Sequence, residues 1–290
     1  MRLFCFGMGY SARRLAQALA PRGWRIAGSC RDASAKTEIE SLGHDAFLFD
    51  RDTRLPPNAL QGASYLLSSV PPDDAGDPVI DRHGADIARL KGLTWAGYLS
   101  STGIYGDTGG ARVNESAPPR PTSARGRRRV AAEAAWLALH ERHGVPVHVF
   151  RLAGIYGPAR SALDQVRARA ARRVDRPGHR FSRIHVDDIA AVLMASMARP
   201  APGAIYNLCD DEAAPAADVV AFACALMAVA APPLVPFAEA EKNMSAMARS
   251  FWRDNRVVDN HRIKKELGVT LRYPDYRTGL RAILAEESGA

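Results

Sequence analysis

The chain has 290 residues, of which 47% are hydrophobic and 24% are charged, a composition typical of soluble globular proteins. It contains no apolar run of about 18 residues, which excludes a membrane-spanning helix, and its first residues lack the layout of a signal peptide, so we expect a cytoplasmic protein. The formal net charge of +8 would suit a polyanionic partner, but acidic residues are interspersed nearly everywhere, and we therefore expect no nucleic-acid surface.

The first 160 residues alternate between strand-like apolar runs and helical patterns. The strand-like runs are Leu3–Phe6, Trp24–Cys30, Ala46–Phe49, Tyr65–Val70, Thr94–Ser100 and Val147–Leu152. The helical patterns between them cover Ala12–Ala20, Ala35–Ser41, Val79–Leu90 and Ser123–Arg142. This alternation predicts a parallel sheet with right-handed crossovers and helices on both faces, which is the doubly wound arrangement of a Rossmann-type α/β fold.

The order loosens after residue 160, where short strands and helices mix. The expected elements are helices over Ser161–Arg173 and from Asp188, strands over Phe181–Val186 and near Ile205–Leu208, and helices over Ala213–Ala231, Asp254–Leu267 and Tyr276–Leu284. We expect residues 1–157, joined by 184–207, to form a nucleotide-binding domain. Residues 158–183 and 208–290 would then form a small α/β region that closes over a substrate.

Residues 7–12, directly after the first expected strand, read G-M-G-Y-S-A and match the pattern G-x-G-x-x-A. In this pattern the first glycine makes a tight turn, the second lets the backbone approach a pyrophosphate, and the small third residue lets helix and strand pack closely. The start of the following helix offers free N–H groups and a favourable dipole to the same anion. The sequence therefore predicts a dinucleotide cofactor, NAD(P), held by Gly7, Gly9, Tyr10, Ser11 and Ala12.

The residues that end the second strand bear on which dinucleotide binds. NAD sites usually place an acid there to hold the ribose hydroxyls, whereas NADP sites omit the acid and supply arginine. Cys30 occupies the expected acid position, and Arg31, which can grip a 2′-phosphate with two hydrogen bonds, follows at once. Asp32 would supply an acid if the register shifted by a residue or two, so NADP is favoured and NAD stays open.

The ends of the third and fourth strands add further candidates for the cofactor site. Asp50 could face the adenine, or it could only form a turn. Ser68, Ser69 and Val70 stand where a doubly wound sheet lines its cofactor crevice. The four cysteines form no metal-ligand spacing with each other or with histidine, so we expect no metal site.

Four motifs follow along the rest of the chain. They are Y-L-S-S-T-G-I-Y-G at 98–106, F-R-L-A-G-I-Y-G-P at 150–158, I-H-V-D-D-I-A at 184–190 and Y-N-L at 206–208. With the glycine turn, these motifs resemble those of the extended and atypical short-chain dehydrogenases/reductases, the NAD(P)-dependent epimerase/dehydratase group, over almost the whole chain. The resemblance implies a Rossmann-type sheet that carries NAD(P) and a small C-terminal region over the substrate, which in many members is a nucleotide sugar.

The resemblance also implies a set of catalytic groups. Members place a serine or threonine at the end of the fifth strand and a Tyr-x-x-x-Lys pair at the start of a long helix, where the tyrosine moves a proton and the lysine lowers its pKa and holds the ribose. Counted back from Tyr105, Ser101 takes the hydroxyl position and Thr102 could share its task, while Ser100 joins the cofactor-binding candidates. Hydrogen bonding to the backbone is the alternative role of Ser101 and Thr102.

Residues 121–133, P-T-S-A-R-G-R-R-R-V-A-A-E, place four arginines within five residues. Gly126 and Glu133 fix the register against the members' P-Y-G-x-S-K-x-x-x-E, so Arg125 falls on the tyrosine position and Arg129 on the lysine position. Arginine stays protonated near neutral pH, so Arg125 cannot move the catalytic proton, but it could stabilise an oxyanion or hold a phosphate or carboxylate. Arg129 could replace the lysine as a fixed charge near the ribose, and a solvated helix face is the alternative for both.

If a proton moves, another group must move it, and the candidates are Tyr105, His185 and Tyr156, each of which could instead serve packing. Two functions remain. One is an oxidoreductase-like enzyme of the epimerase/dehydratase type that acts on a polar small molecule, a nucleotide sugar or another phosphorylated compound. The other is a catalytically silent protein that senses NADP(H) and signals to a partner. Analogy alone suggests a homodimer through the helix that carries Arg125.

Overall fold

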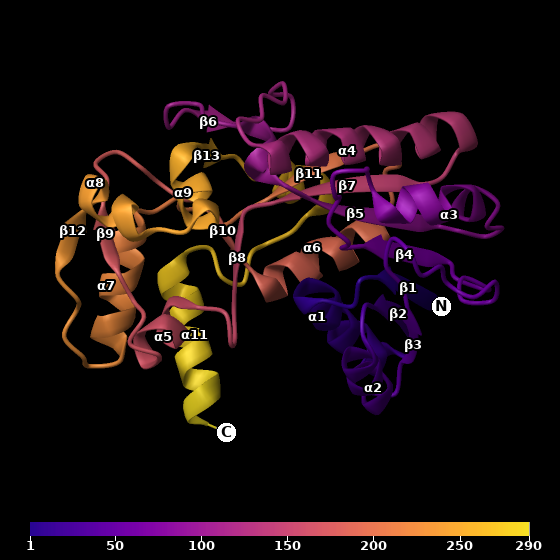
Figure 1. Ribbon diagram of the computed structural model, residues 1–290. Coiled ribbons are helices and arrows are strands. Elements are labelled where there is room, and N and C mark those ends of the chain that lie inside the picture. The colour runs from indigo at the N-terminus through magenta and orange to yellow at the C-terminus, as the bar shows by residue number, and fades with distance from the viewer. Residues whose placement is uncertain (290) are drawn as a thin grey trace.

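Seven parallel strands form the central sheet of the computed structural model, which describes residues 1–289 (Figure 1). They are β1 (Arg2–Phe6), β2 (Arg25–Cys30), β3 (Asp45–Leu48), β4 (Tyr65–Ser68), β5 (Trp95–Ser101), β7 (Val147–Leu152) and β11 (Ile205–Leu208). Their order in space is β3-β2-β1-β4-β5-β7-β11, so the direction of winding reverses between β1 and β4. The doubly wound Rossmann-type sheet expected from the sequence is confirmed, and such sheets bind ligands beyond the carboxyl ends of the strands at this reversal.

Helices cover both faces of the sheet, because successive strand residues point to opposite sides and both sides are apolar. One face carries α1 (Tyr10–Leu19), α2 (Ala33–Ser41) and α6 (Val186–Ala198), and the other carries α3 (Pro78–Ala88) and α4 (Ala124–His143). In Figure 1, α4 lies above β5 and β7, while α6 lies below them and next to α1. On the α4 side, Trp136 stacks on Tyr98 of β5 with ring centroids 5.6 Å apart. Within the described residues, no helix combines the length and the apolar composition needed to cross a membrane.

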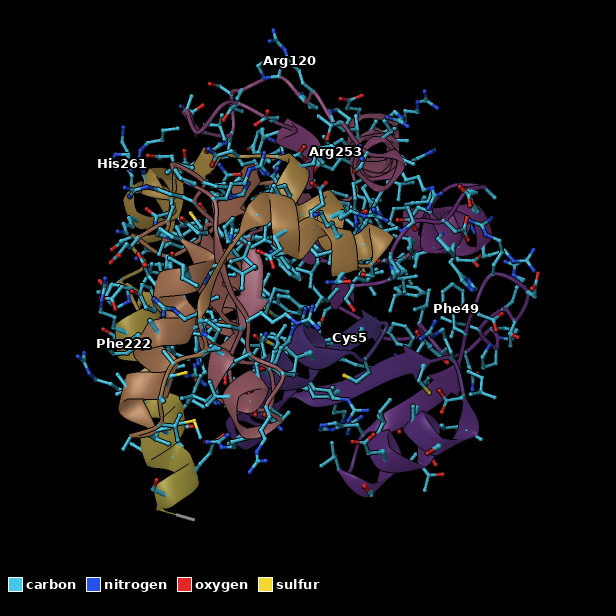
Figure 2. The ribbon with its side chains drawn as sticks, turned by 60° about the vertical axis from the view of Figure 1, so that its left-hand side comes forward. Cys5, Phe49, Arg120, Phe222, Arg253 and His261 are labelled. Atoms are coloured by element: carbon cyan, nitrogen blue, oxygen red, sulfur yellow. The ribbon has the colours of Figure 1, made fainter. Side chains whose placement is uncertain are left out.

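The remaining elements form what we term the second region, residues 154–185 and 209–289. Its strands are β8 (Gly154–Tyr156), β9 (Arg173–Asp175), β10 (Arg183–His185), β12 (Leu234–Pro236) and β13 (Val257–Val258), and its helices are α5 (Ala162–Arg167), α7 (Ala216–Leu226), α8 (Phe237–Ala240), α9 (Ala246–Arg253), α10 (His261–Leu267) and α11 (Tyr276–Ser288). Leu163, Val219 and Leu280 belong to a separate apolar core between α5, α7 and α11. Figure 2 shows this region, with Phe222 labelled, beside the part of the sheet that contains Cys5.

Short connecting elements complete the fold. They are the 3₁₀ helices η1 (Ala20–Arg22), η2 (Thr102–Tyr105) and η3 (Glu241–Asn243), and the two-residue strand β6 (Arg112–Val113), which pairs with β13. The connection η2 matters most for the site, because it turns the chain directly after β5 and packs against the start of α4. Gly126 permits this contact, since a Cβ at that position would lie 2.7 Å from Pro121 Cβ and 3.1 Å from the Gly103 carbonyl oxygen.

The sequence-based expectations for the second region needed four corrections. The helix expected over Ser161–Arg173 ends at Arg167, because Arg169 takes a left-handed conformation with φ +54° and the chain then enters β9 to pair with β12. The helix expected over Asp254–Leu267 begins only at His261, because its first part forms β13. The strand expected over Phe181–Val186 is limited to β10, and the helix expected over Ala213–Ala231 is limited to α7, which starts after Pro215.

Candidate functional site

A cavity of about 880 Å³ lies beyond the carboxyl ends of the central strands, between the sheet and the second region. The sheet side supplies the start of α1, the end of β5 and the start of α4. The second region supplies the residues after β8, the start of α7 and the segment that follows α9. Sequence-predicted residues that line the cavity are Gly9, Tyr10, Ser11, Ser69, Ser100, Ser101, Thr102, Arg125 and Arg129.

At the α1 end of the cavity, Gly7 makes the turn expected of the first glycine. Its φ of +78° lies in the left-handed region, which glycine adopts without strain. A Cβ at this position would lie 3.0 Å from Ser69 Oγ and 3.2 Å from Val70 Cγ2. The Gly7 N–H donates to Ser29 Oγ over 3.0 Å, and Ser69 Oγ donates to the Gly7 carbonyl oxygen. The turn is therefore fixed from β2 on one side and from the end of β4 on the other.

Gly9 leaves open space at the start of α1. A Cβ there would meet no atom within 4 Å, and Gly9 is the N-cap of α1 without a side-chain cap or an acid in the first helical turn. The N–H groups of Tyr10, Ser11 and Ala12 accordingly have no side-chain acceptor, and Ala12 itself is fully buried against the sheet. An uncapped helix start with room in front of it fits the diphosphate of a dinucleotide.

Two charged residues, Arg31 and Asp32, follow directly after β2, and their contacts differ. Asp32 Oδ1 accepts the Ala35 N–H over 2.8 Å as the N-cap of α2, so the acid is committed to the helix. Cys30 ends the strand half-buried. Arg31 is exposed at the same edge, and no carboxylate of the described chain lies within 4 Å of its guanidinium.

The other candidates from the ends of β3 and β4 differ in their contacts. Asp50 Oδ1 accepts the N–H groups of Asp52 and Thr53 over 2.8 and 2.7 Å, and these bonds lower the pKa of Asp50. These contacts are typical of an aspartate that forms a turn. A contact of Asp50 with the adenine of the cofactor stays a prediction. Ser69 reaches the cavity, whereas Ser68 is fully buried and its Oγ has no hydrogen-bond partner in the described chain.

The end of β5 brings two expected hydroxyls to the cavity. Ser101 Oγ accepts the Gly103 N–H over 3.1 Å as the N-cap of η2, which leaves its own proton free to be donated into the cavity. Thr102 is buried but lines the same wall. Ser100 is engaged elsewhere, because its Oγ donates to Glu133 Oε1 over 2.5 Å.

The arginines at the start of α4 separate into different environments. Arg129 is buried and its Nη1 donates to Tyr98 Oη over 3.0 Å and to the Leu99 carbonyl oxygen over 2.7 Å. Arg125 faces the cavity with its guanidinium carbon 5.9 Å from the Phe251 ring centroid, and no carboxylate of the described chain lies within 4 Å of it. Burial, and then the charge of Arg129, lowers the pKa of Arg125, so an anion in the cavity would offset both effects.

The rest of the arginine run lies outside the cavity, as its helical spacing predicts. Arg127 is exposed, and Arg128 pairs with Asp74 in the loop before α3. Arg120, just before the run, extends outward at the edge of the molecule (Figure 2). These basic side chains therefore do not form one continuous patch.

The three candidates for moving a proton are mainly engaged in packing and structural hydrogen bonds. Tyr105 is buried outside the cavity, where its Oη donates to Asn207 Oδ1 over 2.7 Å and accepts from Arg151 Nη1 over 2.9 Å. His185 caps α6, and burial lowers its pKa to about 4. Tyr156 does line the cavity, but burial raises its pKa, and its ring packs against His185.

The second region, which we expected to close over a substrate, contributes charged residues to the cavity wall that no sequence motif indicated. Its charged residues there are Arg160, Asp164, Arg180, Arg183, Asp254 and Arg256. Asp254 accepts from Thr122 Oγ1 over 2.6 Å and from Arg256 Nη1 over 3.1 Å, so it bridges the loop before α4 to the segment after α9. No spacing rule could have located these residues, because they come from three separate stretches of the second region, 160–164, 180–183 and 254–256.

Comparisons with known proteins agree with this geometry. A family model described as "NAD dependent epimerase/dehydratase family" matches residues 85–209. Protein YeeZ of Escherichia coli K12 is 28% identical over 279 residues, which cover 93% of this chain and 95% of YeeZ. A solved structure of a functionally unknown conserved protein from Silicibacter pomeroyi is 49% identical, with a TM-score of 0.92 and 98% of each chain covered.

The fold is also shared with an enzyme of known activity. The structure of UDP-glucuronic acid 4-epimerase from Bacillus cereus, in complex with UDP-glucuronic acid and NAD, has a TM-score of 0.80 to this chain. The two sequences are 16% identical, and the alignment covers 100% of this chain and 99% of the epimerase. At this identity the likeness concerns the arrangement of strands and helices.

Proposed function

The chain belongs to the NAD-dependent epimerase/dehydratase family, and from this premise we propose that it is an NAD(P)-binding, oxidoreductase-like enzyme that acts on an anionic small molecule. The observation that carries the proposal is one cavity with an uncapped helix start at one end and, at the other, Arg125, which has no carboxylate of the described residues within 4 Å. A nucleotide sugar or another phosphorylated compound is the substrate class that such a cavity suits.

The cofactor would lie at the α1 end of the cavity. The open space at Gly9 and the free N–H groups at the start of α1 support a site for its diphosphate. Arg31 supports NADP over NAD, because it forms no ion pair with any residue that the structure describes, while Asp32 caps α2. When bound, the nicotinamide ring would supply an acceptor or donor of hydride.

The substrate would contact residues at the ends of β5 and α4. Ser101 can donate a hydrogen bond to a substrate oxygen, and Arg125 can hold an anionic group or stabilise negative charge on an oxygen. Arg129 braces α4 against β5 and keeps a fixed positive charge beside the site. Arg125 at the tyrosine position cannot exchange a proton near neutral pH, so a step that moves a proton would need another group.

Turnover of nucleotide sugars tests this proposal. The protein is incubated with NADP⁺ or NAD⁺ and a panel of sugar nucleotides that includes UDP-glucose and UDP-glucuronate, while nicotinamide absorbance and product isomers are followed. We expect Arg125→Ala to lower kcat/KM by about tenfold or more, the loss expected for one charged hydrogen bond. Arg127→Ala, on the exposed face of the same helix, serves as the matched control. Equal activity of the two variants would contradict the role of Arg125.

A second function is favoured by the arginines at the expected tyrosine and lysine positions, Arg125 and Arg129. A protein that only binds NADP(H) and signals its redox state needs the helix start and Arg31 but no proton donor. In that case NADPH would raise the melting temperature of the protein, while no sugar nucleotide of the panel would be converted. Conversion of any of them by the wild type, absent in Arg125→Ala, would favour the enzyme.

A further inference from the structure

We propose that Arg160 closes over the cofactor diphosphate from the side opposite the start of α1, with Tyr10 as its support. The inference rests on the proposed function, since it needs a dinucleotide at the α1 end of the cavity. It adds a positioning residue from the second region, which no sequence motif assigned. Three independent features of residues 10 and 157–160 lead to it.

The first feature is the contact between Tyr10 and the turn at residues 157–160. Tyr10 is the first residue of α1, and its Oη donates to the Pro158 carbonyl oxygen over 2.9 Å. The Arg160 guanidinium carbon lies 5.6 Å from the centroid of the Tyr10 ring, at the distance of a cation–π contact. The tyrosine thus holds the arginine beside the helix start, and both residues line the cavity together with Gly9 and Ser11.

The second feature is the conformation of the turn itself. The backbone groups of Gly157 and Arg160 exchange two hydrogen bonds, N–H to carbonyl oxygen, of 3.2 and 3.0 Å. Between them Ala159 has a φ of +57°, in the left-handed region that alanine adopts only at a cost. A Cβ at Gly157 would lie 2.5 Å from Tyr10 Oη, so only glycine lets the turn approach the helix. Strain of this kind is often found at residues that clamp a ligand.

The third feature is charge. No carboxylate of the described chain lies within 4 Å of the Arg160 guanidinium, although arginines nearby are paired, Arg14 with Asp187 and Arg167 with Glu287. The start of α1 supplies only a partial positive charge, roughly half an elementary charge. A diphosphate carries two negative charges, and a guanidinium can bind such oxygens with two parallel hydrogen bonds. Arg160 therefore supplies the full cation that the helix start lacks.

Binding of NADPH to Arg160→Ala tests the inference directly. Nicotinamide fluorescence is titrated at low and at physiological salt for the wild type, Arg160→Ala, Tyr10→Phe and the control Arg172→Ala, which removes an exposed arginine of the second region outside the cavity. We expect Arg160→Ala to raise the Kd for NADPH about tenfold and to flatten its salt dependence. Tyr10→Phe should raise the Kd for NADPH about threefold, because the turn loses its hydrogen bond to the tyrosine hydroxyl. The control should have the Kd of the wild type.

Two further ligands identify the group that Arg160 contacts. ADP-ribose shares the diphosphate but lacks the nicotinamide, so Arg160→Ala should weaken it as much as NADPH. UDP represents the phosphates of a sugar-nucleotide substrate. If Arg160→Ala weakened UDP and left NADPH and ADP-ribose unchanged, the arginine would serve the substrate and the inference would be wrong. Melting curves of the variants show whether each remains folded, which the exposure of Arg160 leads us to expect.

The same titrations separate failure of this inference from failure of the proposed function. If the wild type bound neither NADPH nor NADH, the dinucleotide site itself would be refuted, and the role of Arg160 with it. If the wild type bound NADPH and Arg160→Ala bound it equally well, only the role of Arg160 would be refuted.

Discussion

The two ends of the cavity depend on different parts of the chain. At the start of α1 the backbone forms the site, through the turn at Gly7, the open space at Gly9 and the free N–H groups of the helix. At the start of α4 the chemistry depends on side chains, and arginine stands at both positions where the resemblance described above leads us to expect tyrosine and lysine. The backbone features expected of a cofactor site are thus present beside side chains that differ from those expected, so cofactor binding and proton transfer have to be tested separately.

The helix α4, which carries Arg125 and Arg129 at its start, is held in place by a buried network. Glu133 of α4 forms a buried salt bridge with Arg151 of β7 at 2.8 Å and also accepts from Ser100 Oγ. Arg151 in turn donates to Tyr105 Oη, and Tyr105 donates to Asn207 on β11. This network fixes α4 across three strands and so holds the helix that carries Arg125 and Arg129 in position.

The largest expected effect comes from breaking this network. Glu133→Gln would leave the buried Arg151 without its counter-charge, and we expect the free energy of unfolding to fall by about 3 kcal/mol. Denaturant unfolding measures this loss. If this network did not hold α4 in place, the variant would have the same free energy of unfolding as the wild type. Exposed Glu141→Gln on the same helix is the control.

A substitution at Gly9 sharpens the contrast between stability and binding. Gly9→Asp places a good N-cap residue on α1 in open space at an extended backbone position, with φ −87°, so the fold should keep or slightly gain stability. The new carboxylate would occupy the expected diphosphate position and repel it. We expect NADPH affinity to fall at least 100-fold, about 2.7 kcal/mol, with an unchanged or raised melting temperature. Retained affinity would show that the diphosphate binds elsewhere.

The smallest expected effect concerns the choice of cofactor. Arg31→Ala should raise the Kd for NADPH about tenfold and leave NADH nearly unchanged, because only the 2′-phosphate needs the guanidinium. Arg25→Ala, at the opposite end of the same strand, removes the same charge away from the site. Calorimetric titration of NADPH and NADH into both variants gives the ratio of the two Kd values for each variant. Equal losses for NADPH and NADH in Arg31→Ala would remove the basis for preferring NADP.

The sheet and the glycine turn were predictable because their signals are local. Each central strand is a short apolar run between polar turns, and the glycine pattern sits at the junction of the first strand and helix. The sequence also offers a register for Arg125 and Arg129, because Gly126 and Glu133 stand at fixed spacing around them, and this register stays a prediction. The structure adds why both are needed, one for close packing on η2 and the other for the salt bridge to Arg151.

The sequence led us to expect that the second region covers the site, but it did not show which residues form the cavity wall, because they meet only through tertiary packing. Arg160 gains its position from a left-handed alanine and from the Tyr10 hydroxyl, neither of which has a sequence signal. Asp254–Leu267 shows a helical pattern, but pairing of β13 with β6 overrides it at the first residues. Tyr105 is a suitable proton donor by residue type, and only its buried bonds to Arg151 and Asn207 reveal a structural role.

A crystal structure with NADP⁺ tests the central claim most directly, namely that the helix start binds the cofactor while Arg125 is left for the substrate. We predict the diphosphate within hydrogen-bonding distance of the N–H groups that open α1, and the Arg125 guanidinium free of cofactor contacts. A diphosphate bound to Arg125, or no cofactor in the cavity at saturating concentration, would contradict the account.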